Sequence, residues 1–295
     1  MPSPEHEAIV AAVSNQPTPE TPPTIEQSRA GFEAMTASFV IPDDVRVESV
    51  DVAGIPAAWV TASGARDDAA MLYLHGGGYM MGSVKTHTEL ASRLSAASAA
   101  RVLVLDYRLA PENPFPAPVE DAVAAYRWLV EQGFARERIV IAGDSAGGGL
   151  TLATLAALSE AGDAQPAAAV CLSPFADLEG TGDSYQTADD PLLTKEAVDG
   201  MAMAYLQGQD AKQPTASPIY ADYSGFPPLL IQVGTRELLL DDATRVTERA
   251  RAAGVDVTLE KGEGLIHVWP LFGPGVPEGV EAVDSIGAFV RKHTG

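Results

Sequence analysis

The chain has 295 residues, of which 40 are acidic and 19 are basic, and its formal net charge at pH 7 is −21. This balance argues against nucleic acid and anionic membranes as partners, because binding to both depends on basic side chains that neutralise phosphate groups. Hydrophobic residues make up 46% of the chain, but no run approaches the roughly 20 consecutive apolar residues that span a bilayer. The length allows one large α/β domain or two smaller ones.

Cys171 is the single cysteine, so no disulfide can form within the chain. It lies in an apolar run, and we expect it to be a small buried side chain. The N-terminal residues show no basic stretch followed by an apolar segment, as a secretory signal would. We therefore expect a cytoplasmic enzyme or binding protein.

The first sixty residues divide into three segments. Residues 1–24 are rich in Pro, Thr and Glu, and their first part is expected to lack fixed structure. A helical pattern follows, with an apolar face made of Ile25, Phe32, Met35 and Phe39. The next stretch, 45–61, carries apolar β-formers on both sides of a turn at Gly54, which predicts an antiparallel pair of strands.

From residue 71 onwards, short apolar runs alternate with helical patterns. The runs predicted to be buried strands are Met71–Leu74, Val102–Leu105, Ile139–Ala142, Ala168–Leu172, Leu229–Val233 and Val255–Leu259. Strand–helix alternation of this kind predicts a mostly parallel sheet with helices on both faces. Together with the antiparallel pair, the predicted sheet has eight strands.

One connection, from residue 174 to residue 228, is several times longer than the roughly dozen residues that a crossover needs. Met201, Met203, Tyr205 and Leu206 recur in it at helical spacing. We interpret it as an inserted helical cap that closes over the strand ends together with the N-terminal helices. The alternative for these side chains is that they form the ordinary core of the cap.

The strongest chemical signal is the segment Gly143-Asp144-Ser145-Ala146-Gly147. It follows a predicted strand and begins a predicted helix, which is the setting of a nucleophilic serine on a strained turn between small neighbours. The helix N-terminus offers backbone N–H groups to a developing oxyanion. A phosphate-binding loop is the alternative, but the Lys-Ser/Thr pair of a P-loop is missing.

A run of three glycines provides the second signal. His75-Gly76-Gly77-Gly78 comes directly after the predicted strand Met71–Leu74. Consecutive N–H groups without side chains in the way suit the binding of a carbonyl oxygen as it becomes negative. The alternative is a flexible turn, but the motif matches the oxyanion loop of lipases and esterases.

Two further residues complete a predicted catalytic triad. His267 lies on a loop after the last predicted strand, where it can reach back to Ser145 as general base, and the chain order Ser, acid, His favours it over the other histidines. The acid is expected after the strand Leu229–Val233. We assign Glu237, with Asp241 as the main alternative, although Asp241 also suits the N-terminus of the next helix.

These motifs resemble those of the bacterial hormone-sensitive-lipase family, which are esterases with the α/β-hydrolase fold. The resemblance rests on HGGG at 75–78, GDSAGG at 143–148 and DYRLAPENPFPAPVEDA at 106–122, and it is supported by SPIYADYSGFPPLLIQVGT at 217–235 and HVW at 267–269. It covers roughly residues 40–290. The acid of the family is most often Asp followed by an apolar residue and Leu, whereas this chain has Glu237.

The resemblance implies that Ser145 is the nucleophile, that His267 is the base, and that the oxyanion hole consists of the backbone N–H groups of Gly77, Gly78 and Ala146. It also implies a helical cap made of residues 1–40 and 178–225. Residues 41–177 and 226–295 are then the catalytic domain.

The expected function is hydrolysis of neutral short- to medium-chain carboxylic esters, with no metal or cofactor. A lactone hydrolase of the same fold stays open as an alternative, and a non-catalytic ligand-binding module is disfavoured because no triad member is missing. The candidate pocket residues are Phe32, Met35, Met80, Met81, Met203 and Tyr205. The expected partner is a small-molecule ester, and an edge strand at Val255–Leu259 would allow a homodimer.

Overall fold

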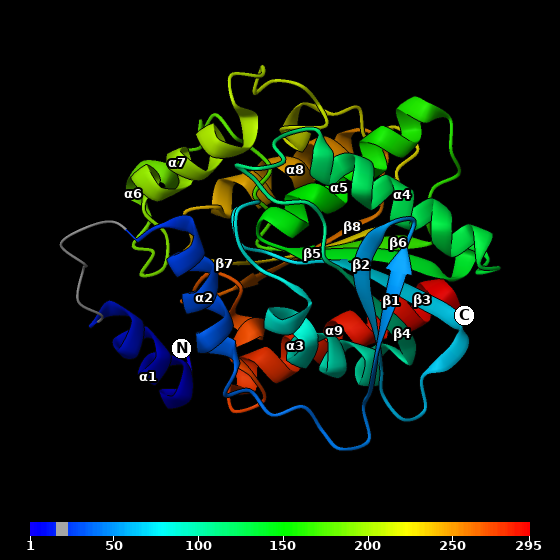
Figure 1. Ribbon diagram of the computed structural model, residues 1–295. Helices are drawn as coiled ribbons and strands as arrows, with labels where there is room; N and C mark the ends of the chain where they lie inside the picture. The colour runs from blue at the N-terminus through cyan, green and yellow to red at the C-terminus, as the bar shows by residue number, and fades with distance from the viewer. Residues whose placement is uncertain (16–22) are drawn as a thin grey trace.

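The computed structural model describes residues 1–15 and 23–295 of the chain. Within these residues, an eight-stranded sheet lies at the centre of the molecule (Figure 1), in the spatial order β1-β2-β4-β3-β5-β6-β7-β8. The strands are β1 Arg46–Val52, β2 Ile55–Thr61, β3 Arg66–Leu74, β4 Ala100–Leu105, β5 Ile139–Asp144, β6 Ala168–Leu172, β7 Leu229–Gly234 and β8 Val257–Gly262.

The predicted pairing of the first two strands is confirmed. β2 runs antiparallel to both of its neighbours, β1 and β4, and every pair from β4 to β8 is parallel. Ala53 and Gly54 both have positive φ and turn the chain between β1 and β2. The last predicted strand is displaced: it begins at Val257 rather than Val255 and continues to Gly262.

Helices cover both faces of the sheet (Figure 1). α4 Ala117–Glu131, α5 Ala146–Ala161 and α8 Leu240–Ala252 lie on one face, and α3 Val84–Ser98 and α9 Pro277–Thr294 lie on the other. Successive side chains of a strand point to opposite faces, so Leu72 and Leu74 join the core beneath α5, whereas Met71 and Tyr73 join the core beneath α3 and α9. Cys171 on β6 is fully buried, as predicted, and its burial raises the pKa of the thiol.

The remaining helices are short. α2 Ile25–Thr36 and α7 Lys195–Leu206 lie at the edge of the sheet where β3 and β5 end, and α1 Pro4–Ser14 and α6 Ser184–Thr187 lie on the same side of the molecule (Figure 1). The 3-10 turns are η1 Arg136–Arg138, η2 Pro218–Tyr220 and η3 Trp269–Phe272. The division of the chain into a catalytic domain and a cap stays a prediction.

The N-terminal prediction was wrong for residues 4–14, which form α1. Ser3 caps this helix by accepting a hydrogen bond from the His6 N–H, and Pro4 occupies its first turn with Glu5 and Glu7. These are favourable helix-start residues, and their positions outweighed the overall composition. The part of that prediction on residues 16–22 lies outside the described residues.

Two further expectations concern contacts with a membrane and with a second copy of the chain. Among the residues described, none of the helices combines the length and the apolar composition that crossing a membrane requires. β8 ends the sheet and has the exposed edge that a homodimer built on this strand would need. The homodimer itself stays a prediction.

Candidate active site

Ser145 occupies a strained turn between β5 and α5. Its backbone φ of 54° and ψ of −120° are sparsely populated by residues other than glycine. A Cβ on Gly147 would collide with the carbonyl of Leu74, and a Cβ on Gly143 would collide with Gly147 itself. The glycines on either side of the serine are therefore required by space.

Ser145, His267 and Glu237 form a continuous chain of hydrogen bonds. His267 Nε2 lies 2.9 Å from Ser145 Oγ, and His267 Nδ1 lies 2.8 Å from Glu237 Oε2. Glu237 is fully buried and His267 is nearly so. Burial lowers the pKa of His267, but the hydrogen bond and charge of Glu237, with smaller contributions from Asp190 and Asp144, outweigh it and raise that pKa above its ordinary value.

The structure brings Glu237 to the histidine and places Asp241 elsewhere. Asp241 Oδ2 accepts a hydrogen bond of 2.9 Å from the Ser184 N–H at the start of α6. The second oxygen of Glu237, Oε1, accepts hydrogen bonds from Ser173 Oγ at 2.7 Å and from the Gly234 N–H at 2.5 Å. Each carboxylate is thus fixed by its own set of partners.

Ser173 is a site residue that sequence reasoning missed. It follows β6 directly, has a φ of 46°, and is fully buried. Its Oγ donates to Glu237 and accepts from the Val268 N–H at 3.1 Å, so one hydroxyl joins the acid to the residue after His267. The available signal was a serine immediately after a buried strand that neighbours β5.

The glycine loop after β3 lies beside the serine. Gly77 and Gly78 line the same cavity as Ser145, with φ values of 118° and 63°, and the Ala146 N–H is at the N-terminus of α5. A Cβ on Gly77 would collide with the Met81 carbonyl. The chain can therefore follow this path only because Gly77 has no side chain.

Asp144 connects the glycine loop to the serine turn. Its Oδ1 accepts hydrogen bonds from Tyr73 Oη at 2.8 Å and from the Gly76 N–H at 3.0 Å. Burial alone would raise the pKa of Asp144, but His87 and the Tyr73 hydrogen bond outweigh it and lower that pKa. An ionised Asp144 therefore fixes the position of Gly76, directly before the two glycines of the predicted oxyanion hole.

Two other histidines, His75 and His6, are buried and contact residues that support the site. His75 stacks on Tyr107 with a ring-centroid distance of 4.3 Å, and burial lowers its pKa to about 3, so it stays neutral. His6, which the sequence places near the terminus, is buried on α1 and its Nε2 accepts a 3.4 Å hydrogen bond from the Ile266 N–H. α1 thus contacts the loop that carries His267.

A cavity of about 210 Å³ opens above Ser145. Of the predicted pocket residues, Phe32, Met35 and Met81 line it. The structure does not bring the other three there. Met203 is 74% exposed, Tyr205 is fully buried in a stack on Tyr79, and Met80 packs against the main core.

The apolar side chains that sequence reasoning missed in this lining are Leu192, Leu193, Met201, Val268, Leu271 and Phe272. Met201 and Met203 differ because residues two apart on a helix point in nearly opposite directions. The sequence identified α7 as a helix but did not determine which of its faces meets the cavity.

The chain belongs to the α/β-hydrolase family, whose model matches residues 71–271. It is 47% identical to an acetyl-hydrolase of Streptomyces hygroscopicus over 92% of this chain and 91% of that protein. It is 32% identical to an esterase of Acinetobacter venetianus over 84% of this chain and 82% of that protein.

Solved structures agree with these relatives. The crystal structure of an esterase from the bacterial hormone-sensitive lipase family matches with a TM-score of 0.96 and 49% identity, covering 100% of both chains. A hormone-sensitive lipase from a metagenome library matches with a TM-score of 0.94 and 39% identity, also over 100% of both chains. The predicted fold class and the predicted resemblance to this family are confirmed, and the protein is an esterase.

Proposed function

We propose that the protein is a serine carboxylic-ester hydrolase that cleaves neutral short- to medium-chain esters through an acyl-enzyme. The observation that carries the proposal is the unbroken chain of hydrogen bonds from Glu237 through His267 to Ser145, which ends at the apolar cavity. A serine hydroxyl becomes a strong nucleophile when a neighbouring base, itself held by a third group, accepts its proton.

In the first half of the reaction, Ser145 Oγ attacks the ester carbonyl carbon while His267 Nε2 takes the hydroxyl proton. Glu237 accepts the Nδ1–H of His267 and stabilises the imidazolium. The carbonyl oxygen becomes negative and accepts hydrogen bonds from the N–H groups of Gly77, Gly78 and Ala146. The C–O bond to the leaving alcohol then breaks, and His267 gives that alcohol its proton.

In the second half, water replaces the alcohol. His267 removes a proton from the water as it attacks the acyl-enzyme, and the same N–H groups stabilise the second oxyanion. Collapse returns the proton to Ser145 Oγ and releases the acid. Asp144 and Ser173 support both halves, because they hold the glycine loop and Glu237 in position.

The cavity and the surface charge favour the proposed substrate class. A volume of about 210 Å³ is below the roughly 300–1,000 Å³ of pockets for drug-sized ligands, and its lining is mainly apolar, so a short or medium acyl chain fits. The net charge of −21 disfavours approach of anionic esters relative to neutral ones. Added salt should weaken that discrimination by screening the field.

Replacement of the nucleophile is the main test. Ser145→Ala is expected to lower kcat on p-nitrophenyl butyrate by about 10⁶-fold, as for other serine hydrolases, while Ser38→Ala, at an exposed serine, leaves it unchanged. A Ser145→Ala enzyme that keeps turnover would overturn the proposal. Assays over acyl chains of increasing length, and on ε-lactones at matched concentration, then define the substrate; faster lactone turnover would contradict the carboxylesterase assignment.

The acid has its own test. Glu237→Gln is expected to lower kcat by about 10⁴-fold, because an amide cannot hold the histidine in the productive tautomer. Asp241→Asn, which removes a charge of the same sign from the first turn of α8, is expected to keep kcat within about twofold, because Asp241 accepts its hydrogen bond from the Ser184 N–H and not from His267. The reverse order of losses would show that Asp241 is the acid.

A further inference from the structure

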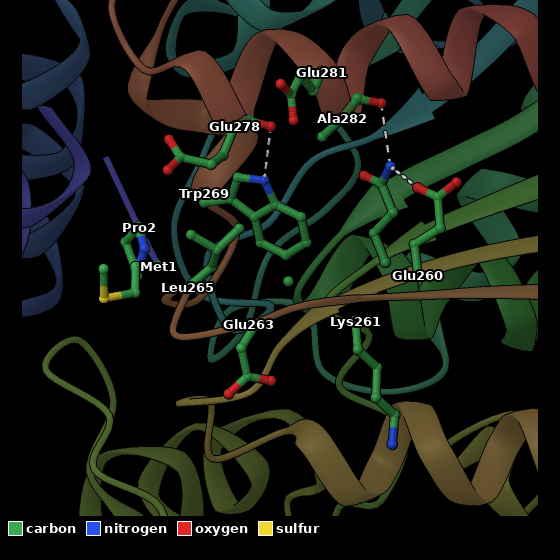
Figure 2. Close-up of a pocket in the computed structure, with 12 residues that line it drawn as sticks. Met1, Pro2, Glu260, Lys261, Glu263, Leu265, Trp269, Glu278, Glu281 and Ala282 are labelled. Atoms are coloured by element: carbon green, nitrogen blue, oxygen red, sulfur yellow. Dashed lines mark hydrogen bonds between the residues drawn. The ribbon is translucent and has the colours of Figure 1, made fainter. Parts of the chain in front are cut away.

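A second cleft lies behind the loop that carries His267, between β8, η3 and the start of α9 (Figure 2). Its volume is about 330 Å³. Among the described residues, its lining has no member in common with the lining of the ester cavity. The cleft is therefore a separate feature that the proposed esterase chemistry does not use.

The cleft is strongly acidic. Four glutamates, Glu260, Glu263, Glu278 and Glu281, line it together with one basic side chain, Lys261, and with Met1 and Pro2 at the N-terminal end of the chain. Figure 2 shows the side chains of Lys261 and Glu263 both pointing away from the ring of Trp269. Glu278 accepts hydrogen bonds from Ser3, and Glu260 accepts them from Gln232 and Ser285. The four carboxylates nevertheless outnumber the positive charges of the lining, so the cleft attracts cations.

A buried side chain of the lining has an unused acceptor. Gln232 is 1% exposed, and its Nε2 donates to Glu260 Oε2 at 2.7 Å and to the Ala282 carbonyl at 3.1 Å (dashed lines at these residues in Figure 2). Both partners are acceptors, which fixes the orientation of the amide. Its Oε1 has no hydrogen-bond partner among the residues that the structure describes.

A buried acceptor without a donor is unfavourable, because it has lost water and gained no hydrogen bond. Both amide hydrogens of Gln232 are already used, so the side chain cannot rotate to satisfy Oε1 without breaking two bonds. A ligand that supplies an N–H group would satisfy this oxygen. The same ligand would be attracted by the carboxylates if it were positively charged.

The cleft also has an apolar part. Leu265 and Trp269 lie next to each other in Figure 2, on the loop and turn that flank His267. Trp269 Nε1 donates to the Glu278 carbonyl at 3.1 Å, which holds the indole in place. An indole ring attracts cations and also packs well against a carbon chain.

These features distinguish between kinds of cation. Within the described part of the chain, no group of three or more His, Cys, Asp and Glu side chains could hold a metal ion. The side chains of Leu265 and Trp269 are also not metal ligands. We propose that the cleft binds a primary alkylammonium ion. Its N–H groups donate to Gln232 Oε1 and to the surrounding carboxylates, and its carbon chain lies against Leu265 and Trp269.

Isothermal titration calorimetry with n-butylammonium chloride tests the proposal. We expect one binding site per chain, with 1-butanol, a neutral analogue, binding at least about tenfold more weakly. Butyltrimethylammonium keeps the charge but has no N–H group, and it is expected to bind less tightly than n-butylammonium. Equal affinity for 1-butanol, or no binding of n-butylammonium, would overturn the proposal.

Variants separate the contribution of the hydrogen bond to Gln232 from that of the carboxylate charges. Gln232→Met is expected to weaken n-butylammonium binding by about tenfold, because a hydrogen bond to a charged group is lost. The double variant Glu263→Gln/Glu281→Gln, at two exposed residues, is expected to weaken it by about fivefold. If Gln232→Met does not fold, the double variant still decides the outcome.

Two controls test whether binding is specific to the cleft. Glu160→Gln/Glu248→Gln removes the same charge from exposed residues outside the cleft and should leave the affinity unchanged. An equal loss would show general attraction to an acidic surface and no specific site. Enzyme sulfonylated at Ser145 should bind n-butylammonium as before; loss of binding would place the ligand in the ester cavity and overturn the proposal.

Discussion

Two walls enclose the ester cavity, one formed by the loops after β3, β5 and β8 and the other mainly by α2 and α7. The loop wall is tightly packed: a methyl group on Gly77 or Gly147 would collide with backbone. The helical wall is open to solvent: Gly31 of α2 and Gly200 of α7 are exposed and do not line the cavity, and a methyl group on either would meet nothing within 4 Å. The two walls thus differ in how much space surrounds their backbones.

The difference in packing matches the chemical role that we propose for each wall, catalysis for the loops and acyl-chain binding for the helices. Oxyanion stabilisation and proton transfer depend on donors and acceptors fixed before the substrate arrives, and the loop wall holds Ser145 in a strained turn that its neighbours impose. An apolar acyl chain needs only shape and hydrophobic surface. The helical wall supplies these from partly exposed side chains such as Met35, which is 45% exposed.

The strongest test of the difference between the two walls is a glycine-to-alanine substitution in each of them. Gly77→Ala is expected to lower kcat on p-nitrophenyl butyrate by about 10²–10³-fold, the usual effect of losing an oxyanion donor, because the loop must move away from the Met81 carbonyl. Gly200→Ala is expected to keep kcat and to stabilise α7 by about 0.5–1 kcal/mol. Equal losses in kcat would show that the walls do not differ.

Ser173→Ala tests whether the loop wall acts as a connected unit. Loss of the hydroxyl leaves Glu237 Oε1 and the Val268 N–H each without one hydrogen bond, which should cost about 1–3 kcal/mol of unfolding free energy. We expect kcat to fall about tenfold, since 1.4 kcal/mol is one order of magnitude, with little change in KM. Thermal unfolding and steady-state kinetics measure the two effects, and an unchanged kcat would remove Ser173 from the positioning network.

Two methionines of α7 sharpen the description of the helical wall. Met201→Ala enlarges the cavity and is expected to raise the ratio of kcat/KM for the octanoate ester over the butyrate ester by about tenfold, the scale of a methylene in an apolar pocket. Met203→Ala, at a side chain 74% exposed, should leave that ratio unchanged. Similar shifts in both variants would contradict the orientation of α7.

The pH dependence tests the charge environment of His267. The base must be neutral to accept the Ser145 proton, so kcat/KM should fall as the pH drops through the pKa of His267. Because Glu237 raises that pKa against the effect of burial, the midpoint should lie above 6.5. The residual activity of Glu237→Gln should have a lower midpoint, and a wild-type midpoint below 6.5 would contradict this account.

Local patterns predicted a large part of the site. The strained turn at Ser145 and the glycine loop at Gly77 can be recognised in the sequence. Small residues are required wherever one stretch of backbone closely approaches another, and here they occur next to each other in the chain. Glu237 was preferred over Asp241, which also suits the N-terminus of the next helix, and the structure places Glu237 against His267. Ser173 was missed because a single serine has no spacing pattern, and its partners lie 64 and 95 residues away.

Orientation was harder to predict than element type. α7 was expected as a helix, yet Met203 and Tyr205 proved to face solvent and core, whereas Met201 faces the cavity. Helical periodicity groups side chains by face but does not state which neighbour each face meets. α1 was missed for a different reason: composition was weighed above the capping residues Ser3 and Pro4.

The alternation of strands and helices, the strand-to-helix turn at Ser145 and the glycine loop could all be predicted from the sequence, because these features depend on residues close together in the chain. Only the folded structure shows that Ser173 supports Glu237, that Asp241 lies away from His267, and that Gln232 has an unused acceptor in an acidic cleft. Those contacts join residues far apart in sequence, and they exist only once the parallel strands bring their ends together.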